Sequence, residues 1–353
     1  MSYKESNYEN AIIQLFEKLG YEHVYGPDIE RDYSDPLYGE EFRTCLAVIN
    51  PNLPPEAIDE AVYKIRNIDN QKLELRNAVF TDYLQNGIDV AYIQNGEQKY
   101  DKVNLVDYAN IDKNSFIIAN QWTIVEKSEK RADLIVFLNG IPLVVVELKS
   151  PSREETDVSA AYRQLRNYML EIPSLFVYNA FCVMSDMAET KAGTITAGED
   201  RFMAWKTTDG SYESTKFADY NTFFNGIFEK QRFLDIVKNF ICFSNEGQKM
   251  VKILAAYHQY FAVNKAIEST IKASNSDGKA GVFWHTQGSG KSLSMVFYAN
   301  LLQRDLKTPT VVVITDRNDL DDQLFGQFAR CKDFLRQTPI QAESREHLKK
   351  FII

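Results

Sequence analysis

Apolar residues at helical spacing open the chain. In residues 7–19 they fall on one face of a predicted amphipathic helix, and Gly20 supplies a C-terminal stop. Residues 56–84 repeat this helical character after a pair of prolines, which favours the start of a helix. We therefore predict one helix at 7–19 and two helices within 56–84, with a break near residues 67–70.

The pattern changes to that of strands between residues 88 and 149. Residues 88–126 are rich in β-forming side chains, with Gly96 as a turn. The clearest element follows, where the runs ADLIVFL and IPLVVVELK flank Asn139-Gly140. This dipeptide suits the positive φ angles of a two-residue hairpin turn. Because both runs are almost entirely apolar, we expect a central antiparallel pair at 132–149, buried on both faces.

Further along, helices and strands alternate with polar loops. An amphipathic helix is predicted around 158–169, and residues 226–272 have a helical pattern. The remaining expectations are an apolar strand at 180–184, loops and edge strands at 190–215, a strand at 281–285 that leads into a glycine-rich loop and a helix, and a β-branched strand at 310–315.

This order of elements predicts an α/β protein with two domains and a boundary near residue 240. At 353 residues and 44% hydrophobic content, the chain exceeds the roughly 250–300 residues of a single core. It has no apolar targeting segment, and its longest apolar run is far below the roughly 20 residues of a membrane span. We expect a soluble, cytoplasmic protein. The cysteines (Cys45, Cys182, Cys242 and Cys331) lack CxxC spacing, so neither zinc nor disulfides are predicted.

The net charge of −9 is distributed unevenly along the chain. Residues 1–240 contain 25 Lys and Arg against 38 Asp and Glu, a balance of −13, whereas residues 241–353 contain 15 against 11, a balance of +4. Non-specific affinity for DNA comes mostly from neutralisation of phosphates by basic residues. If the first domain acts on DNA, we expect it to depend on partners or on a local basic groove.

Three charged residues gather at one end of the predicted hairpin. Asp133 opens the first strand, while Glu147 and Lys149 close the second, so the turn brings all three toward the same end. Two carboxylates can hold a hard cation such as Mg²⁺, which lowers the pKa of an attacking water. A lysine can stabilise charge in the transition state. The pattern favours phosphodiester hydrolysis, with Asp133 and Glu147 as metal ligands and Lys149 as a catalytic residue.

A purely structural interpretation is open for the same residues. Asp133 and Lys149 could mark solvated strand ends, with Glu147 paired to Lys149 or to Arg131. Against it, Glu147 directly follows the apolar run LVVV. An unpaired charge beside a buried sheet is costly unless a metal or another cation accompanies it.

Asp133 and the tripeptide Glu147-Leu148-Lys149, separated by a hairpin, resemble the PD-(D/E)XK nuclease pattern, with Ala132 where that pattern has proline. The resemblance implies a central mixed sheet flanked by helices. It also implies that Asp133 and Glu147 bind Mg²⁺ and that Lys149 is catalytic.

Two further features resemble the RecB-like branch of that superfamily. Gln164 and Tyr168 lie four residues apart on the predicted helix, and so on one helical face, as in the QxxxY motif. The resemblance places both at the catalytic site. Glu9, on the first helix, matches an acidic residue that such nucleases present to the metal, although a surface glutamate is an equal alternative.

A second motif lies in residues 282–297, VFWHTQGSGKSLSMVF. The run Gly288-Ser289-Gly290-Lys291-Ser292 stands between a predicted strand and a predicted helix, the order that a phosphate-binding loop requires. The glycines let N–H groups turn toward phosphates, and the helix N-terminus adds its dipole. Lys291 would reach the β and γ phosphates and Ser292 would coordinate Mg²⁺. The sequence predicts an ATP site, with a chance loop as the alternative.

The flanks of this loop resemble superfamily 2 helicases and translocases. His285 stands where the strict pattern has glycine, as in the variant of that superfamily. Gln259, within YHQY, resembles the glutamine that reads adenine, with a plain surface glutamine as the alternative. Residues 310–315 and the following Arg317 resemble motif Ia, which touches the DNA backbone. Arg317 could instead pair with a nearby acidic residue, Asp319 or Asp322.

The run WHTQGSGKS followed by TDRNDLDDQLF, behind the ELK hairpin and QxxxY, is similar to the restriction subunit of type I restriction-modification enzymes. This resemblance implies a RecB-like endonuclease at 1–240 and a partial first RecA-like motor domain at 241–353. It implies double-stranded DNA as substrate, Mg²⁺ and ATP as cofactors, and methyltransferase and specificity subunits as partners. No DEAD-type acidic motif, second RecA-like domain or arginine finger precedes Ile353, so we expect no ATP hydrolysis from this chain alone.

Two other functions are open at this point. The chain could bind DNA or the methyltransferase complex without cutting, if cleavage needs the rest of the motor. It could also be an ATP-binding protein that acts independently of nucleic acid, if the ELK hairpin is coincidental. Metal-dependent DNA cleavage that is lost in Asp133→Ala would favour the nuclease over both.

Overall fold

The computed structural model describes residues 5–149, 158–216, 219–307, 309–316 and 318–352. The chain divides into two compact units, Met1–Lys238 and Asn239–Ile353, close to the boundary expected near residue 240. Each unit is described by itself. Among the described residues, no helix is both long and apolar enough to span a bilayer.

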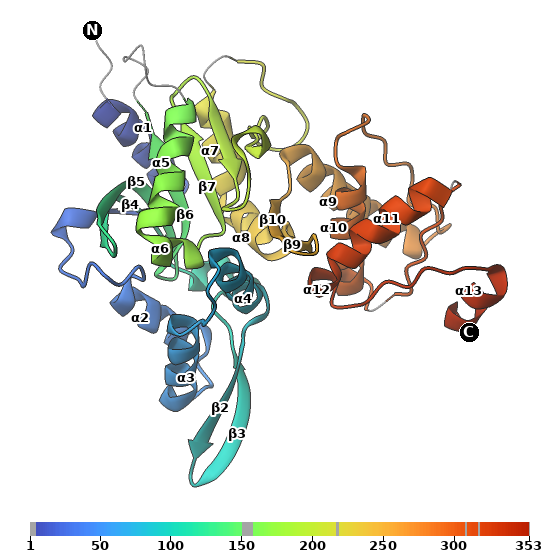
Figure 1. Cartoon of the computed structure of the whole chain (residues 1–353), viewed down its shortest axis with the longest axis horizontal. Coiled ribbons are helices and arrows are strands. Elements are labelled where there is room, and N and C mark those ends of the chain that lie inside the picture. Colours follow the sequence, from blue (N-terminus) through green and yellow to red (C-terminus); the bar gives the residue numbers. More distant parts are fainter. Residues whose placement is uncertain (1–4, 150–157, 217–218, 308, 317, 353) are drawn as a thin grey trace. The chain divides into compact units, whose positions relative to one another are not determined.

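A six-stranded mixed sheet forms the centre of the first unit (Figure 1), in the order β1-β4-β5-β6-β7-β8. β1 runs parallel to β4 and β6 runs parallel to β7, while the other neighbours are antiparallel. The bounds are β1 Glu22–Tyr25, β4 Phe116–Val125, β5 Glu129–Leu138, β6 Ile141–Leu148, β7 Phe181–Ser185 and β8 Thr190–Gly193. The expected central mixed sheet with flanking helices is confirmed.

Helices cover both faces of this sheet. On one face, Phe228 of α7 (Tyr220–Phe228) packs with its ring centroid 5.9 Å from Phe181 of β7 and 4.9 Å from Phe16 of α1 (Glu5–Lys18). On the other face, α5 (Val158–Glu171) and α6 (Pro173–Val177) share a core with the next residue of β7, Cys182. Successive strand residues point to opposite faces, so β7 is buried by helices on both sides. α8 (Lys230–Asn239) follows α7.

The central hairpin is formed as the sequence predicts. Asn139 and Gly140 have φ angles of 53° and 74°, the left-handed values of a tight two-residue turn. Every residue of β6 is buried, as its apolar sequence requires. The side chain of Asn139 is also buried, and it binds Leu105, Asn114 and Ser115. The turn residue therefore anchors the hairpin as well as allowing its geometry.

Most of the remaining elements of the first unit lie between β1 and β4 along the sequence. The two helices predicted within 56–84 are confirmed, with the break where expected, and Gly96 forms the turn of an antiparallel hairpin. The elements are η1 Gly26–Asp28, α2 Gly39–Ile49, α3 Pro55–Arg66, α4 Leu73–Asn86, β2 Ile88–Gln94, β3 Glu97–Val103 and η2 Ile111–Lys113, with η3 Glu199–Arg201 later in the unit.

The second unit corrects one expectation. The helical pattern predicted for 226–272 is wrong at 241–254, where β9 (Ile241–Asn245) and β10 (Met250–Leu254) pair in an antiparallel hairpin. Apolar runs this short fit a strand and a helix equally well, and Gly247, with a φ of 78°, provides the turn between them. The helices of this unit are α9 Tyr257–Ser274, α10 Lys291–Asp305, α11 Asn318–Arg330, α12 Lys332–Leu335 and α13 Arg345–Ile352.

The two strands predicted in the second unit are not formed as strands. Residues 281–285 and 310–315 form no ladder with any described strand, and Val282 and Trp284 are 96% and 77% exposed. A strand requires a hydrogen-bonded neighbour, which a hydrophobic pattern cannot reveal. The apolar character of both segments was read correctly from the sequence, but their pairing was not.

Candidate functional site

The three charged residues predicted at the hairpin end lie together in the structure. Leu134 of β5 pairs with Val146 of β6, which places Asp133 opposite Glu147. The backbone N–H of Leu148 donates to Oδ2 of Asp133 at 2.8 Å. The Nζ of Lys149 lies 2.5 Å from Oε1 of Glu147. β5 begins at Glu129, so Asp133 lies in the middle of this strand and does not open it, opposite the end of β6. Two carboxylates and one ammonium are thus brought into a single group.

Glu147 is a buried acid with one satisfied oxygen. The residue is 2% exposed, and its Oε2 is buried with no hydrogen-bond partner among the described residues. Burial, together with the negative charge of Asp133, raises the pKa of Glu147 to about 8. Lys149 and the hydroxyl of Tyr168 oppose this rise but do not outweigh burial. The carboxyl group of Glu147 therefore changes its protonation state near neutral pH, as functional-site acids often do.

The QxxxY residues approach the same group from α5. Tyr168 is buried, and its hydroxyl donates to the carbonyl oxygen of Arg131 at 2.9 Å. Burial raises the pKa of Tyr168 well above its ordinary value, the charge of Glu147 raises it further, and a hydrogen bond with Gln164 opposes the rise. Tyr168 is thus a neutral hydroxyl between Glu147 and β5, with Gln164 one helical turn before it.

Glu9 of α1 contacts β4 through both oxygens of its carboxylate. Its Oε1 accepts from Nδ2 of Asn120 at 2.6 Å, and its Oε2 accepts from Nε2 of Gln121 at 2.8 Å. Both oxygens are used by amides of β4. Among the described residues, no three His, Cys, Asp or Glu side chains are grouped so as to hold a metal ion. Glu9 therefore does not form a three-residue ligand set with Asp133 and Glu147.

The pair of carboxylates nevertheless fits a divalent cation such as Mg²⁺. The unpartnered Oε2 of Glu147 is the observation that supports this, since a buried oxygen without a donor is costly. Mg²⁺ is typically bound by one or two carboxylates, with water and phosphate oxygens completing its shell. Asp133 and Glu147 would supply the protein ligands.

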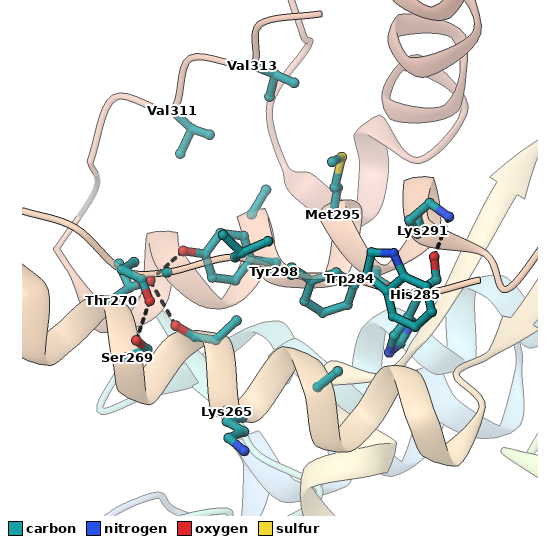
Figure 2. Close-up of a pocket in the computed structure, with 18 of the residues that line it drawn as sticks. Lys265, Ser269, Thr270, Trp284, His285, Lys291, Met295, Tyr298, Val311 and Val313 are labelled. Atoms are coloured by element: carbon teal, nitrogen blue, oxygen red, sulfur yellow. Dashed lines mark hydrogen bonds between the residues drawn. The ribbon is translucent and has the colours of Figure 1, made fainter. Parts of the chain in front are cut away.

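In the second unit, the glycine-rich loop precedes α10 as predicted. Gly288 and Gly290 have φ angles of 83° and 78°, values that favour glycine. The Nζ of Lys291 donates to the carbonyl oxygen of His285 at 2.9 Å (Figure 2). It also donates to the carbonyl oxygen of Thr286 at 2.8 Å. Ser289 and Ser292 lie on either side of Gly290 and Lys291, and Ser292 falls in the first turn of α10. The lysine is thus folded back onto its own loop.

Gln259 contacts this loop rather than pointing away from it. Its Nε2 donates to the carbonyl oxygen of Gly290 at 3.0 Å, and its Oε1 accepts from the N–H of Ala256 at 2.9 Å. The neighbouring His258 binds the carbonyl oxygen of Ser289 through Nε2 at 3.2 Å. His258 is a contact of the loop that the sequence analysis does not single out. Its position beside Gln259 in YHQY was the available signal.

A pocket of about 700 Å³ adjoins the loop, between α9, α10 and the extended segments at 281–285 and 311–314 (Figure 2). Its wall is mostly apolar, and a hydrogen bond of 2.5 Å joins the hydroxyls of Thr270 and Tyr298. Lys291 lies at one end of the pocket. Arg317, predicted to contact DNA phosphate, lies outside the described residues.

Two family models match separate parts of the chain. Residues 2–201 match the family described as type I restriction enzyme R protein N terminus, and residues 258–352 match the SWI2/SNF2 ATPase family. The type I restriction enzyme HindI endonuclease subunit of Haemophilus influenzae is 41% identical over 99% of this chain and 35% of its own length.

A second relative is the protein of Methanocaldococcus jannaschii provisionally named type I restriction enzyme MjaIXP endonuclease subunit. It is 32% identical over 97% of this chain and 36% of its own length. The chain thus spans about a third of the length of the curated relatives that it matches.

Proposed function

The chain belongs to the family of type I restriction enzyme R proteins, and from this premise we propose that its first unit is the Mg²⁺-dependent, PD-(D/E)XK-type endonuclease of a cytoplasmic restriction system. The substrate is double-stranded DNA and the reaction is phosphodiester hydrolysis. One observation carries the proposal. The buried Glu147, with its unpartnered Oε2, lies opposite Asp133 and within 2.5 Å of Lys149.

Each side chain has a role that follows from its position. Asp133 and Glu147 would hold Mg²⁺, which lowers the pKa of an attacking water and stabilises charge on the phosphate. Glu147 must lose its proton to act as a ligand. Lys149 would then donate to the phosphate or orient the water. Tyr168, hydrogen-bonded to the carbonyl of Arg131, and Gln164 would keep Glu147 and β5 in register.

For the second unit we infer an ATP site that belongs to a RecA-like DNA translocase. Lys291 would leave the carbonyl oxygens of His285 and Thr286 and bind the β and γ phosphates of ATP. Ser292 would contact Mg²⁺. The glycine-rich loop and the match to the SWI2/SNF2 ATPase family support this role. We also propose that the chain acts with methyltransferase and specificity subunits, which the type I family implies.

The test is nicking of supercoiled plasmid by the wild-type chain and by Glu147→Ala, with Mg²⁺ and without ATP. We expect relaxed plasmid with the wild type only. Glu171→Ala, at the C-terminal end of α5, is the matched control for loss of a carboxylate and should nick normally. Nicking that survives Glu147→Ala would refute the assignment of this site.

A second candidate is a chain that binds DNA or its partner subunits without cutting. It is favoured by the pKa of about 8 for Glu147, which keeps much of that carboxyl protonated at neutral pH, and by the charge balance of −13 in residues 1–240. No nicking by a folded wild-type chain at pH 8.5, where Glu147 is mostly ionised, would select this function over the nuclease.

A further inference from the structure

Strand β4 contains a backbone irregularity directly opposite the candidate metal site. Gln121 has a φ of 54°, in the left-handed region that side-chain-bearing residues seldom adopt. Asn120 pairs with Leu134 of β5, and Trp122 pairs with Ala132. Gln121 therefore lies opposite Asp133, so the strained residue and the candidate ligand occupy the same level of the sheet.

The irregularity changes which residues of β4 face α5. Before it, Ile117 and Ala119 belong to the core shared with α5, and after it Trp122 belongs to the same core. A regular strand alternates with a period of two, so residues 119 and 122 could not share a face without a change of phase. In β5, Ala132 and Ile135 belong to this core although they are three residues apart, so this strand shows the same change of phase. Asp133 therefore stands where both strands change phase.

Glu9 holds the irregular segment from α1. Adjacent residues of a strand ordinarily point to opposite faces, yet Asn120 and Gln121 both donate to Glu9, at 2.6 and 2.8 Å. On the same segment, η1 packs so closely that a Cβ on Gly26 would lie 2.9 Å from the carbonyl oxygens of both residues. The left-handed backbone of Gln121 is thus held by the carboxylate of Glu9 and by the close approach of Gly26.

We propose that Glu9 is a positioning residue, which acts through Gln121 to fix the backbone opposite Asp133 and so sets the Asp133 carboxylate relative to Glu147. This inference rests on the proposed nuclease function. It differs from the direct metal ligand that the resemblance implies for Glu9, and it accounts for the hydrogen bonds that both Glu9 oxygens accept from the two amides.

The test is whether glycine at position 121 rescues the loss of Glu9. Glycine adopts a left-handed backbone without side-chain support. A metal ligand, by contrast, cannot be replaced in this way. Mn²⁺ affinity is measured by titration calorimetry for the wild type, Glu9→Ala, Gln121→Gly and the double variant. Glu17→Ala, an exposed carboxylate on the same helix, is the control.

We expect Glu9→Ala to weaken Mn²⁺ binding by about 10- to 100-fold, the usual effect of removing a group that orients a ligand. The double variant should recover most of that loss, and Glu17→Ala should bind as the wild type does. A double variant no better than Glu9→Ala, or an unchanged affinity in Glu9→Ala, would overturn the proposal.

A second measurement separates this inference from the proposed function. The N–H of Leu148 donates to Asp133 at 2.8 Å, so its hydrogen-exchange rate reports the placement of Asp133 without metal or DNA. We expect faster exchange in Glu9→Ala, recovery in the double variant, and unchanged exchange in β7. If the wild type binds no Mn²⁺, the nuclease proposal fails, while this exchange pattern still decides the role of Glu9.

Discussion

The carboxylate of Glu147 and the ammonium of Lys149 lie 2.5 Å apart at the end of β6, yet the second oxygen of Glu147 is buried without a hydrogen-bond partner in the part of the chain that the structure describes. The lysine therefore satisfies only half of the carboxylate. A buried ion pair is stable only when its remaining polar atoms are also satisfied. This relationship makes the metal-free site sensitive to pH and favours the entry of a cation.

The stability of the metal-free chain should fall as the pH rises from about 5 to 8. The folded protein raises the pKa of Glu147 from its ordinary value to about 8, so the folded state binds this proton more tightly than the unfolded chain does. The resulting stabilisation is complete below the ordinary pKa and is lost as the pH passes about 8. Urea unfolding in EDTA at pH 5, 6.5 and 8 measures it.

Glu147→Gln is the control for that pH dependence. We expect the free energy of unfolding of this variant to lack the decrease with pH that Glu147 causes in the wild type. At pH 8 the variant should therefore be more stable than the wild type by about 2 to 4 kcal/mol. A decline of the same size in the variant would assign the effect to other groups.

Metal affinity should have the opposite pH dependence. A divalent cation requires the ionised form of Glu147, so binding releases a proton. Between pH 6 and 7.5, below the pKa of about 8, the apparent affinity for Mn²⁺ should rise about tenfold per pH unit. Calorimetry in two buffers of different ionisation enthalpy counts the proton released. A flat affinity across this range would exclude Glu147 as the titrating ligand.

Tyr168→Phe should affect the candidate site more than the fold. The variant removes the donor to the Arg131 carbonyl, at a cost of about 1 kcal/mol. Plasmid nicking should fall by about tenfold, a loss similar in free energy to one lost hydrogen bond in the transition state. Tyr162→Phe, on the same helix as Tyr168, is the matched control, since the Tyr162 hydroxyl donates to the carbonyl oxygen of Ala197. We expect Tyr162→Phe to lower stability but to leave plasmid nicking unchanged.

Asn139→Ala should destabilise the first unit by about 2 to 4 kcal/mol. Asn139 has a left-handed φ and a buried side chain bound to Leu105, Asn114 and Ser115, so alanine leaves buried polar groups without partners. Asn95→Ala tests the turn geometry alone, because Asn95 has a φ of 54° in the exposed β2–β3 turn. That variant should cost about 1 kcal/mol, and equal costs would contradict the role of the buried network.

Lys291→Ala should abolish ATP binding without affecting nicking. The ammonium of Lys291 is held at the loop by His285 and Thr286, where it can reach bound phosphates. Binding of a fluorescent ATP analogue to the wild-type chain measures this, and we expect a loss of at least about tenfold. Lys265→Ala removes an exposed lysine that lines the same pocket (Figure 2) and should bind the analogue normally. Equal losses in both variants would argue for general electrostatic attraction.

Local sequence determined the parts of this protein that depend on neighbours along the chain. Asn139-Gly140 specifies its own turn, because few dipeptides tolerate two left-handed residues. The two-residue spacing of Glu147 and Lys149 places both on one face of β6, and the structure joins them at 2.5 Å. The glycine-rich loop before α10 was equally readable, because the glycines and the helix start adjoin in sequence.

The tertiary structure alone decided the properties that depend on distant segments. The pKa of Glu147 comes from burial and from Asp133 across the sheet, and the bend at Gln121 is held by Glu9 from α1. Neither the pKa of Glu147 nor the backbone conformation of Gln121 can be read from the spacing of apolar residues. The same glutamine can stand in a regular strand or at an irregularity. Likewise the β9–β10 pairing, and the absence of a ladder at 281–285 among the described residues, depend on which strands become neighbours. Hydrophobic spacing reports burial but does not report the partner.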